Sequence, residues 1–247
     1  MTLLTTIQMW RSRRMVAYAG LSAALYALLL VAFKQSIVLI PGVTELRLAS
    51  LLPPALSLLL GPAAAWGCAA GNLIGDVLGG TLTAGSIGGV LGNFLLGFLP
   101  FALWGRLGLA SSNEDPALRS LSTWLEYLIV VFLASAAAGV TIGWGVDAAG
   151  LVPFAVLASI IIFNNTVAGT LGGLIVALLY RPLAARGWTW DRVIKRPEPR
   201  RGFIGPVLIA LGGGGGWILG TTWVIPPLVL PVTGVCVLLL LVGVALL

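Results

Sequence analysis

The sequence has 247 residues but no histidine, only two cysteines, and few charged residues. Without histidine the chain lacks the commonest metal ligand, the usual general base and the usual axial ligand of haem. Cys68 and Cys236 both lie in apolar segments, where we interpret them as small packing residues rather than as a disulfide or metal pair. We expect no cofactor and no bound metal.

Carboxylates are scarce too, and this argues against catalysis. The eight acidic residues are scattered, whereas phosphotransfer or metal-dependent lipid chemistry needs them clustered. An intramembrane aspartyl protease needs two membrane-embedded aspartates, and Asp76 has no obvious mate. A serine protease would usually want a histidine beside its serine. We therefore expect that the protein is not an enzyme.

Apolar residues are abundant instead. The chain is 59% hydrophobic and 9% charged, with a mean hydropathy of +1.06, so it has too little polar surface to cover a soluble globule. A helix needs about 20 apolar residues to cross the bilayer, and only helices or closed barrels satisfy their backbone groups in lipid. Leu151 to Tyr180 lacks the alternation of a barrel strand. The sequence predicts an all-α, polytopic transmembrane helical bundle.

The apolar runs divide the chain into three parts. We predict a six-helix core in residues 1–180, a basic interfacial connector in residues 181–202, and a C-terminal transmembrane hairpin in residues 203–247. The hairpin would be two short spans broken near Pro226 and Pro227. The six core spans are Met15 to Phe33, Leu46 to Leu60, Pro62 to Leu78, Ser86 to Trp104, Leu121 to Trp144 and Leu151 to Tyr180.

Basic residues flank these spans, which makes nucleic-acid binding a poor explanation of the net charge of +6. Short cytoplasmic loops carry an excess of Lys and Arg. With the N-terminus inside, only Lys34 and Arg47 of the fourteen basic residues fall outside, so both termini are predicted to be cytoplasmic. The twelve inside are Arg11, Arg13, Arg14, Arg106, Arg119, Arg181, Arg186, Arg192, Lys195, Arg196, Arg200 and Arg201.

Small residues spaced four apart mark helix contact faces, because lipid tails give no hydrophobic drive and helices associate by close backbone approach. Internal packing is the expected role of most such stripes, including Gly71, Gly75 and Gly79, Gly88 and Gly92, and Gly169 and Gly173. The run Gly212 to Gly216 lacks the following Lys and Ser or Thr of a P-loop, so we expect tight packing or a flexible break there.

Polar groups inside spans are expensive and need a partner or a ligand. Most of them fall in the outer half of the predicted bundle, which suggests a polar cavity open to the outside and a substrate site within it. The predicted substrate-binding residues are Glu45, Arg47, Asn72, Asp76, Asn93, Asn164 and Asn165. The alternative is structural: the asparagines bond across helices, and Arg47 pairs with Glu45 or Asp76 as a clamp between helices.

The order of these features resembles the substrate-binding (S) component of energy-coupling factor (ECF) transporters, prokaryotic importers of vitamins and related micronutrients. The shared features cover about residues 15–180. They are the stripe Ala19, Ala23, Ala27, the outer loop Pro41-Gly42-Val43-Thr44-Glu45-Leu46-Arg47, the inner turn Gly61-Pro62, and the run Gly71-Asn72-Leu73-Ile74-Gly75-Asp76.

This resemblance implies a membrane protein of the prokaryotic plasma membrane that captures a small-molecule substrate. It also implies partners, a membrane coupling subunit contacted through Ala19, Ala23 and Ala27 and two cytoplasmic ATPases, which fits the lack of any Walker motif in this chain. The alternative function is a non-catalytic accessory subunit that packs in a larger membrane complex. The apolar block after Arg201 is not part of the usual six-helix unit.

Overall fold

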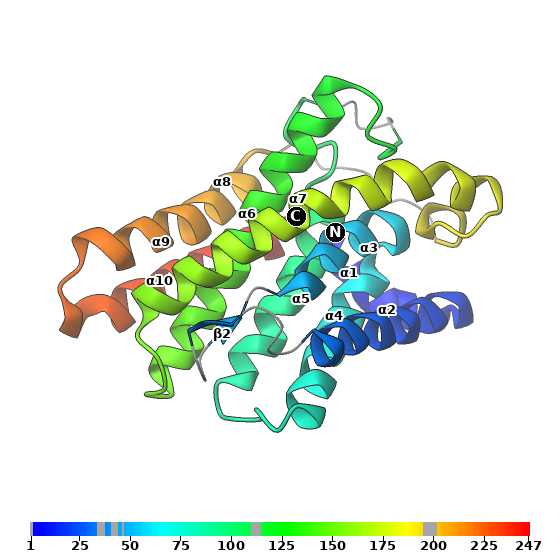
Figure 1. Cartoon of the computed structure of the whole chain (residues 1–247). Helices are drawn as coiled ribbons and strands as arrows, with labels where there is room; N and C mark the ends of the chain where they lie inside the picture. The colour runs from blue at the N-terminus through cyan, green and yellow to red at the C-terminus, as the bar shows by residue number, and fades with distance from the viewer. Residues whose placement is uncertain (1, 34–37, 41–43, 46, 110–114, 195–201) are drawn as a thin grey trace.

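The computed structural model describes residues 2–33, 38–40, 44–45, 47–109, 115–194 and 202–247. It is a helical bundle, as predicted, with a single short antiparallel pair of strands, β1 (Val38–Ile40) and β2 (Thr44–Glu45), among the described residues (Figure 1). The main helices are α1 (Thr2–Gln8), α2 (Arg13–Ala32), α3 (Leu52–Leu60), α4 (Pro62–Leu78), α5 (Ser86–Leu103), α6 (Leu121–Ala148), α7 (Phe154–Ala185), α8 (Ile204–Ala210), α9 (Gly216–Ile218) and α10 (Pro226–Ala245).

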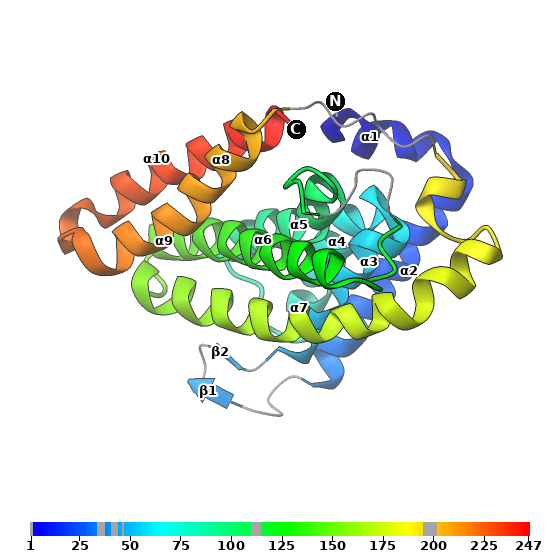
Figure 2. The same cartoon turned by 90° about the horizontal axis from the view of Figure 1, so that it is seen from above.

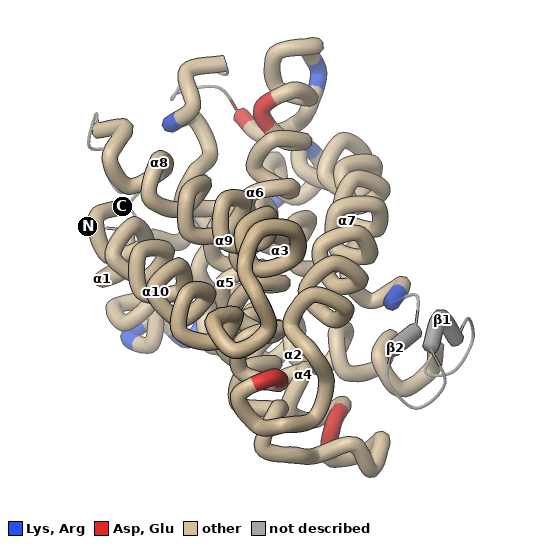
Figure 3. The backbone as a smooth tube through the Cα atoms, turned by 90° about the vertical axis from the view of Figure 1, so that its left-hand side faces the viewer, with Lys and Arg blue, Asp and Glu red and all other residues tan. Residues whose placement is uncertain are grey.

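Shorter turns connect these helices. They are the 3-10 segments η1 (Met9–Arg11), η2 (Leu48–Leu51) and η3 (Trp190–Arg192), and the π-helical segments η4 (Leu211–Gly215) and η5 (Leu219–Trp223). Six helical stretches are long and apolar enough to cross a membrane. These are Arg13–Ala32, Ser86–Leu103, Leu121–Ala148, Phe154–Arg192, Ile204–Trp223 and Pro226–Ala245. Charged positions are sparse along them (Figure 3).

The second predicted span, Leu46 to Leu60, is shorter in the structure. Its α-helical part α3 has nine residues, which rise about 14 Å against the roughly 30 Å of hydrocarbon. Pro53 and Pro54 stand in its first turn, where a missing amide hydrogen breaks no helical bond. All nine residues are buried, so α3 is a central core helix rather than a full span.

The other core helices surround α3 in chain order. Helix α2 packs against α4, α4 against α5, α5 against α6 and α6 against α7. Helix α3 lies inside this arrangement and contacts α4, α5 and α7. The C-terminal hairpin of α8, α9 and α10 lies beside α6 (Figure 2). Its two arms are broken where Pro226 and Pro227 begin α10, as predicted.

The contact between α2 and α4 depends on glycine. A Cβ on Gly67 would collide with the side chain of Ser22, and one on Gly71 would lie 2.8 Å from the carbonyl oxygen of Ala23. The two helices therefore touch backbone to backbone. The predicted glycine contacts on α5 and α7 are also close helix contacts. A Cβ on Gly92 would collide with Ile142 of α6, and one on Gly169 would lie 3.1 Å from Pro54 of α3.

The alanine stripe of α2 takes part in this contact. Ala19, Ala23 and Ala27 are 6%, 9% and 6% exposed, because α4 covers them. Within this structure they pack inside the chain and present no free surface to a partner. This burial differs from the expectation of a docking face, and its physical reason is the glycine stripe on the facing side of α4.

The glycine run of the hairpin also serves close packing. Gly212 lies against Leu240 of α10, and Gly213 against Ala136 and Ala137 of α6, with the chain wound as a π-helical turn at this point. At the far end of the hairpin, the indole Nε1 of Trp217 donates to Ser159 Oγ of α7 at 2.9 Å. Tight packing is therefore the role of Gly212 and Gly213, whereas the space beside Gly214 and Gly215 is open.

Helix α1 was not predicted from the sequence. It lies near the end of α10, where the Arg106 guanidinium donates to both Thr2 Oγ1 at 2.7 Å and the Leu247 carbonyl oxygen at 2.8 Å. Thr2 Oγ1 donates to the same carbonyl at 2.7 Å. Partial burial lowers the pKa of Arg106, but a guanidinium stays charged at neutral pH. Arg106 thus joins the core to both α1 and the hairpin.

Helix directions place the charges at two ends. Helices α2 and α4 run parallel, whereas α5 is antiparallel to both α4 and α6, and α6 to α7. The starts of α2 and α6 therefore meet the ends of α5 and α7, and we name this the basic end. It carries Arg11, Arg13, Arg14, Arg106, Arg119, Arg181, Arg186 and Arg192, while Arg47 alone among the described arginines belongs to the opposite end.

The glycine contact gives a stability prediction. We expect Gly67→Ala to destabilise the protein by about 1–3 kcal/mol, since the new methyl group meets Ser22 and lies 2.7 Å from the Ala19 carbonyl oxygen. Gly20→Ala is the matched control, because its Cβ meets nothing within 4 Å and alanine favours a helix by about 0.5–1 kcal/mol. Thermal unfolding in mild detergent measures both. Equal melting temperatures would contradict the packing.

Candidate functional site

Three helices contribute side chains to one buried polar cluster. The Tyr26 hydroxyl of α2 donates to Asn93 Oδ1 of α5 at 2.6 Å. Asn93 Nδ2 in turn donates to Asn72 Oδ1 of α4 at 3.0 Å and to the carbonyl oxygen of Gly89 at 2.8 Å. The three side chains are at most 3% exposed. We name Tyr26, Asn93, Asn72 and Asp76 the polar relay.

Asp76 is the end of the relay that reaches the surface. Asn72 Nδ2 donates to Asp76 Oδ2 at 3.3 Å, one turn further along α4, and Asp76 is half-buried near the end of that helix. Gly89 makes room for this pair, because a Cβ there would lie 2.8 Å from Asn72 Nδ2. A molecule arriving at the opposite end therefore meets the Asp76 carboxylate before the buried amides.

Arg47 lies near the relay, and its Nε atom has no hydrogen-bond partner among the described residues. Arg47 directly precedes η2, and η2 packs against α2, the helix that carries Tyr26. Within the described part of the chain, Arg47 Nε and Ser50 Oγ are buried and lack hydrogen-bond partners. A buried polar atom left unpaired costs about 1–3 kcal/mol, so these two atoms are places where a water molecule or a ligand would be bound.

The predicted clamp would pair Arg47 with Asp76 or Glu45. Arg47 and Asp76 form no ion pair in the structure, and the ion pair found among the described residues joins Arg181 and Asp115 at 3.7 Å. Glu45 belongs to β2, but its side chain lies outside what the structure describes, as do residues 41–43 and 46 of the predicted outer loop.

Asn164 and Asn165 are on α7, apart from the relay. Both are buried, at 2% and 5% exposure, about one turn before Gly169 contacts Pro54 of α3. Segment η2, which begins directly after Arg47, packs against both α2 and α7. The structure thus joins Asn72, Asp76 and Asn93 by hydrogen bonds, whereas Asn164 and Asn165 lie on a different helix.

Tyr26 is the relay member that sequence reasoning missed. The small residues of the first span drew attention to packing, although a tyrosine hydroxyl in an apolar helix needs a partner just as an asparagine does. Ser50 was missed for a different reason. Its hydroxyl becomes exceptional only through burial, which the tertiary fold imposes on the 3-10 segment η2.

Taken together, the cluster suits binding rather than bond breaking. Its amides bond to one another, to Gly89 and to Asp76, so the groups open to a ligand are the half-buried Asp76 carboxylate and the unpaired Arg47 Nε and Ser50 Oγ. Polar groups of this kind orient small ligands by hydrogen bonds in protein binding sites. Fold and site together define a polytopic membrane protein of the substrate-binding type.

Comparison with known proteins names the family. The model of the QueT transporter family matches residues 16–181, about two thirds of the chain, and the chain belongs to this family. The family is an S-component family of ECF transporters, so the resemblance found in the sequence is confirmed. No curated protein and no solved structure matches. The protein is thus a membrane-embedded, substrate-binding transporter component and not an enzyme.

The relay can be tested by its stability contribution. Asn93→Leu removes the partners of both the Tyr26 hydroxyl and the Asn72 carbonyl oxygen, and we expect a loss of about 1–3 kcal/mol. Ser135→Ala is the control, because Ser135 Oγ bonds only to the Val131 carbonyl of its own helix and should contribute roughly 0.6 kcal/mol or less. Unfolding by heat in detergent measures the difference. A loss no larger than that of the control would contradict the relay.

Proposed function

We propose that this protein captures a queuosine precursor from outside the cell and delivers it to an ECF-type importer. The family match over residues 16–181 supports the substrate, since the family is associated with queuosine precursors. The polar relay supports a site for it, because it joins a carboxylate to three hydrogen-bonding side chains, and Arg47 precedes a segment that packs on the same helix as Tyr26.

The chemistry of the relay fits a nucleobase-like ring. Asparagine amides recognise the donor and acceptor edge of such rings in pairs of hydrogen bonds, and a carboxylate accepts from a ring or exocyclic N–H group. Asp76 supplies that carboxylate at the accessible end, while Arg47 Nε and Ser50 Oγ remain to be paired. In this proposal Glu45, Asn164 and Asn165 complete the substrate-binding set from the β2 and α7 sides.

Orientation and partners belong to the same proposal. The basic end faces the cytoplasm of a prokaryotic plasma membrane, with both termini inside, since Lys and Arg are retained on that side. A membrane coupling subunit and cytoplasmic ATPases supply the energy. The family match ends at residue 181, which supports the division into a core, a connector of residues 181–202 and a hairpin of residues 203–247.

The coupling subunit would dock on α2, through the small residues of this helix that are exposed on the surface of the bundle. Ala17, Gly20 and Ala24 are exposed on this helix, and the space beside Gly20 is open. They follow one another at three- and four-residue spacing and so share a face, as Ala19, Ala23 and Ala27 do on the α4 side. The proposed docking face therefore moves from the buried stripe to its exposed neighbour on the same helix.

Ligand binding tests the proposed substrate. Purified protein in nanodiscs should bind a queuosine precursor, and Asp76→Asn should weaken binding at least tenfold, since a hydrogen bond to a charged group is worth about 1.5–3 kcal/mol. Asp147→Asn is the matched control, being another half-buried carboxylate, at the end of α6. Isothermal titration gives both affinities. An unliganded protein that co-purifies with a stable non-transport complex would instead support an accessory subunit.

Association tests the proposed docking face. We expect Gly20→Leu to fold normally and to bind the substrate, because Gly20 is exposed and a Cβ there meets nothing within 4 Å. It should nevertheless prevent co-purification with the coupling subunit, since a bulky side chain stops close helix approach. Leu25→Ala, at an exposed position away from the glycine, serves as control. Unchanged assembly of the Gly20→Leu variant would rule the face out.

A further inference from the structure

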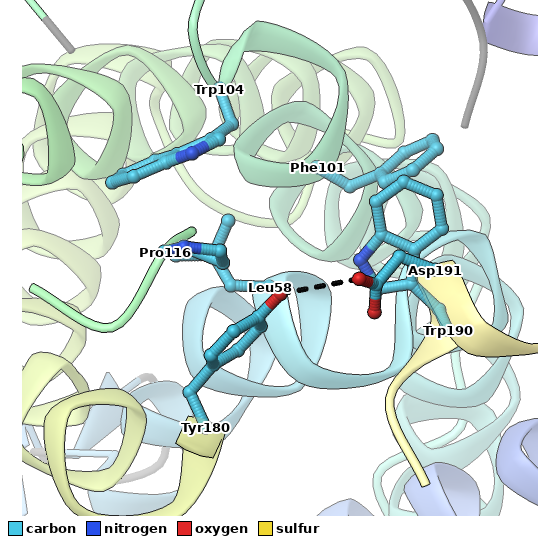
Figure 4. Close-up of a pocket in the computed structure, with 7 residues that line it drawn as sticks. All are labelled: Leu58, Phe101, Trp104, Pro116, Tyr180, Trp190 and Asp191. Atoms are coloured by element: carbon cyan, nitrogen blue, oxygen red, sulfur yellow. Dashed lines mark hydrogen bonds between the residues drawn. The ribbon is translucent and has the colours of Figure 1, made fainter. Parts of the chain in front are cut away.

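A second site lies at the basic end, far along the bundle from the polar relay. Figure 4 shows four aromatic side chains, Phe101, Trp104, Tyr180 and Trp190, around one pocket together with Asp191. The lining also includes Leu58 of α3 and Pro116. The rings of Phe101 and Trp190 meet edge to face with their centres 4.7 Å apart, so this wall of the pocket is firmly packed. We name these residues the aromatic cage.

Asp191 gives the cage its charge. Its Oδ2 accepts a long hydrogen bond of 3.5 Å from the Tyr180 hydroxyl (Figure 4). Its other oxygen, Oδ1, is buried and has no hydrogen-bond partner among the residues that the structure describes. A buried, unpaired carboxylate oxygen is costly, so its presence inside a ring of aromatic side chains calls for a positively charged occupant.

Aromatic faces and a carboxylate are the two groups that hold an ammonium ion. The faces attract it through their quadrupoles, and the carboxylate accepts its hydrogen bonds. The pocket holds about 20 Å³, which is room for about one water molecule. A primary ammonium group has this size, whereas a trimethylammonium group is several times larger. The volume of the pocket therefore admits a primary ammonium group and excludes a trimethylammonium group.

The position of the cage indicates where such a group comes from. Trp104 directly follows the last residue of α5, and Tyr180 directly precedes Arg181, so both lie where apolar helix gives way to charge. Tryptophan and tyrosine favour this level of the bilayer, beside the lipid headgroups. Arg192, next to Asp191 in the chain, is exposed and can meet a phosphate. A lipid headgroup with an ammonium and a phosphate matches both the cage with Asp191 and the neighbouring Arg192.

We propose that the aromatic cage binds the headgroup of an aminophospholipid, with the primary ammonium between the rings and Asp191, and the phosphate near Arg192. Phosphatidylethanolamine has this headgroup, whereas phosphatidylcholine has the larger trimethylammonium and phosphatidylglycerol has no cation. The site is separate from the one proposed for the transported substrate, and its occupant is a lipid of the surrounding membrane.

Native mass spectrometry of the full chain tests this proposal. Delipidated protein is titrated with phosphatidylethanolamine, phosphatidylcholine or phosphatidylglycerol of matched acyl chains. We expect about a fivefold or greater preference for phosphatidylethanolamine, lost in Asp191→Asn and kept in Asp147→Asn, a carboxylate of the opposite end. Arg192→Gln, at an exposed position, should weaken the preference while leaving the fold intact. Melting temperatures confirm that each variant is folded.

Several outcomes would overturn the proposal. One is equal binding of phosphatidylethanolamine and phosphatidylcholine, and another is a preference that survives Asp191→Asn. Full competition by soluble ethanolamine at the same concentration as the lipid would assign the cage to a soluble cation. If the preference for phosphatidylethanolamine appears only in the double variant Lys195→Gln, Arg196→Gln, the cage is occupied by a basic side chain of this protein and not by a lipid.

Discussion

Close approach of helix backbones at glycine is the constraint on which the polar relay depends. Gly67 and Gly71 let α2 lie directly on α4, and this brings the Tyr26 hydroxyl within reach of Asn93. Gly89 then leaves the space that the Asn72 amide occupies between α4 and α5. In a bilayer no water can replace a lost partner, so packing and polar pairing must be satisfied together.

Much of this architecture could be read from the sequence. Apolar runs, bounded by proline and glycine, predict the helices, because a helix that crosses the bilayer must be both long and hydrophobic. The spacing of Asn72 and Asp76 puts them on one face of a helix, and the structure joins them by a hydrogen bond. Their link to Asn93 was within reach for the same reason, since asparagines in apolar helices need partners across the bundle.

Other features could not be predicted, and the reason is physical. Helix α2 carries two stripes of small residues, one with Ala19 and Ala23 and the other with Ala17 and Gly20, and periodicity alone does not tell which faces α4. The shortness of α3 depends on its surroundings, because a fully buried helix need not match the thickness of the bilayer. The cage likewise combines residues from α3, α5, α7 and η3, which only the tertiary fold brings together.

The contact that joins Thr2, Arg106 and Leu247 has a consequence for the timing of assembly. Thr2 and Leu247 are 245 residues apart in the chain, so this junction closes only after the helices between them have been made. Contacts between residues so distant in the chain form late, since many segments must already be in place. Helix α1, which precedes the hairpin in the chain, therefore makes this contact only once the hairpin is in place.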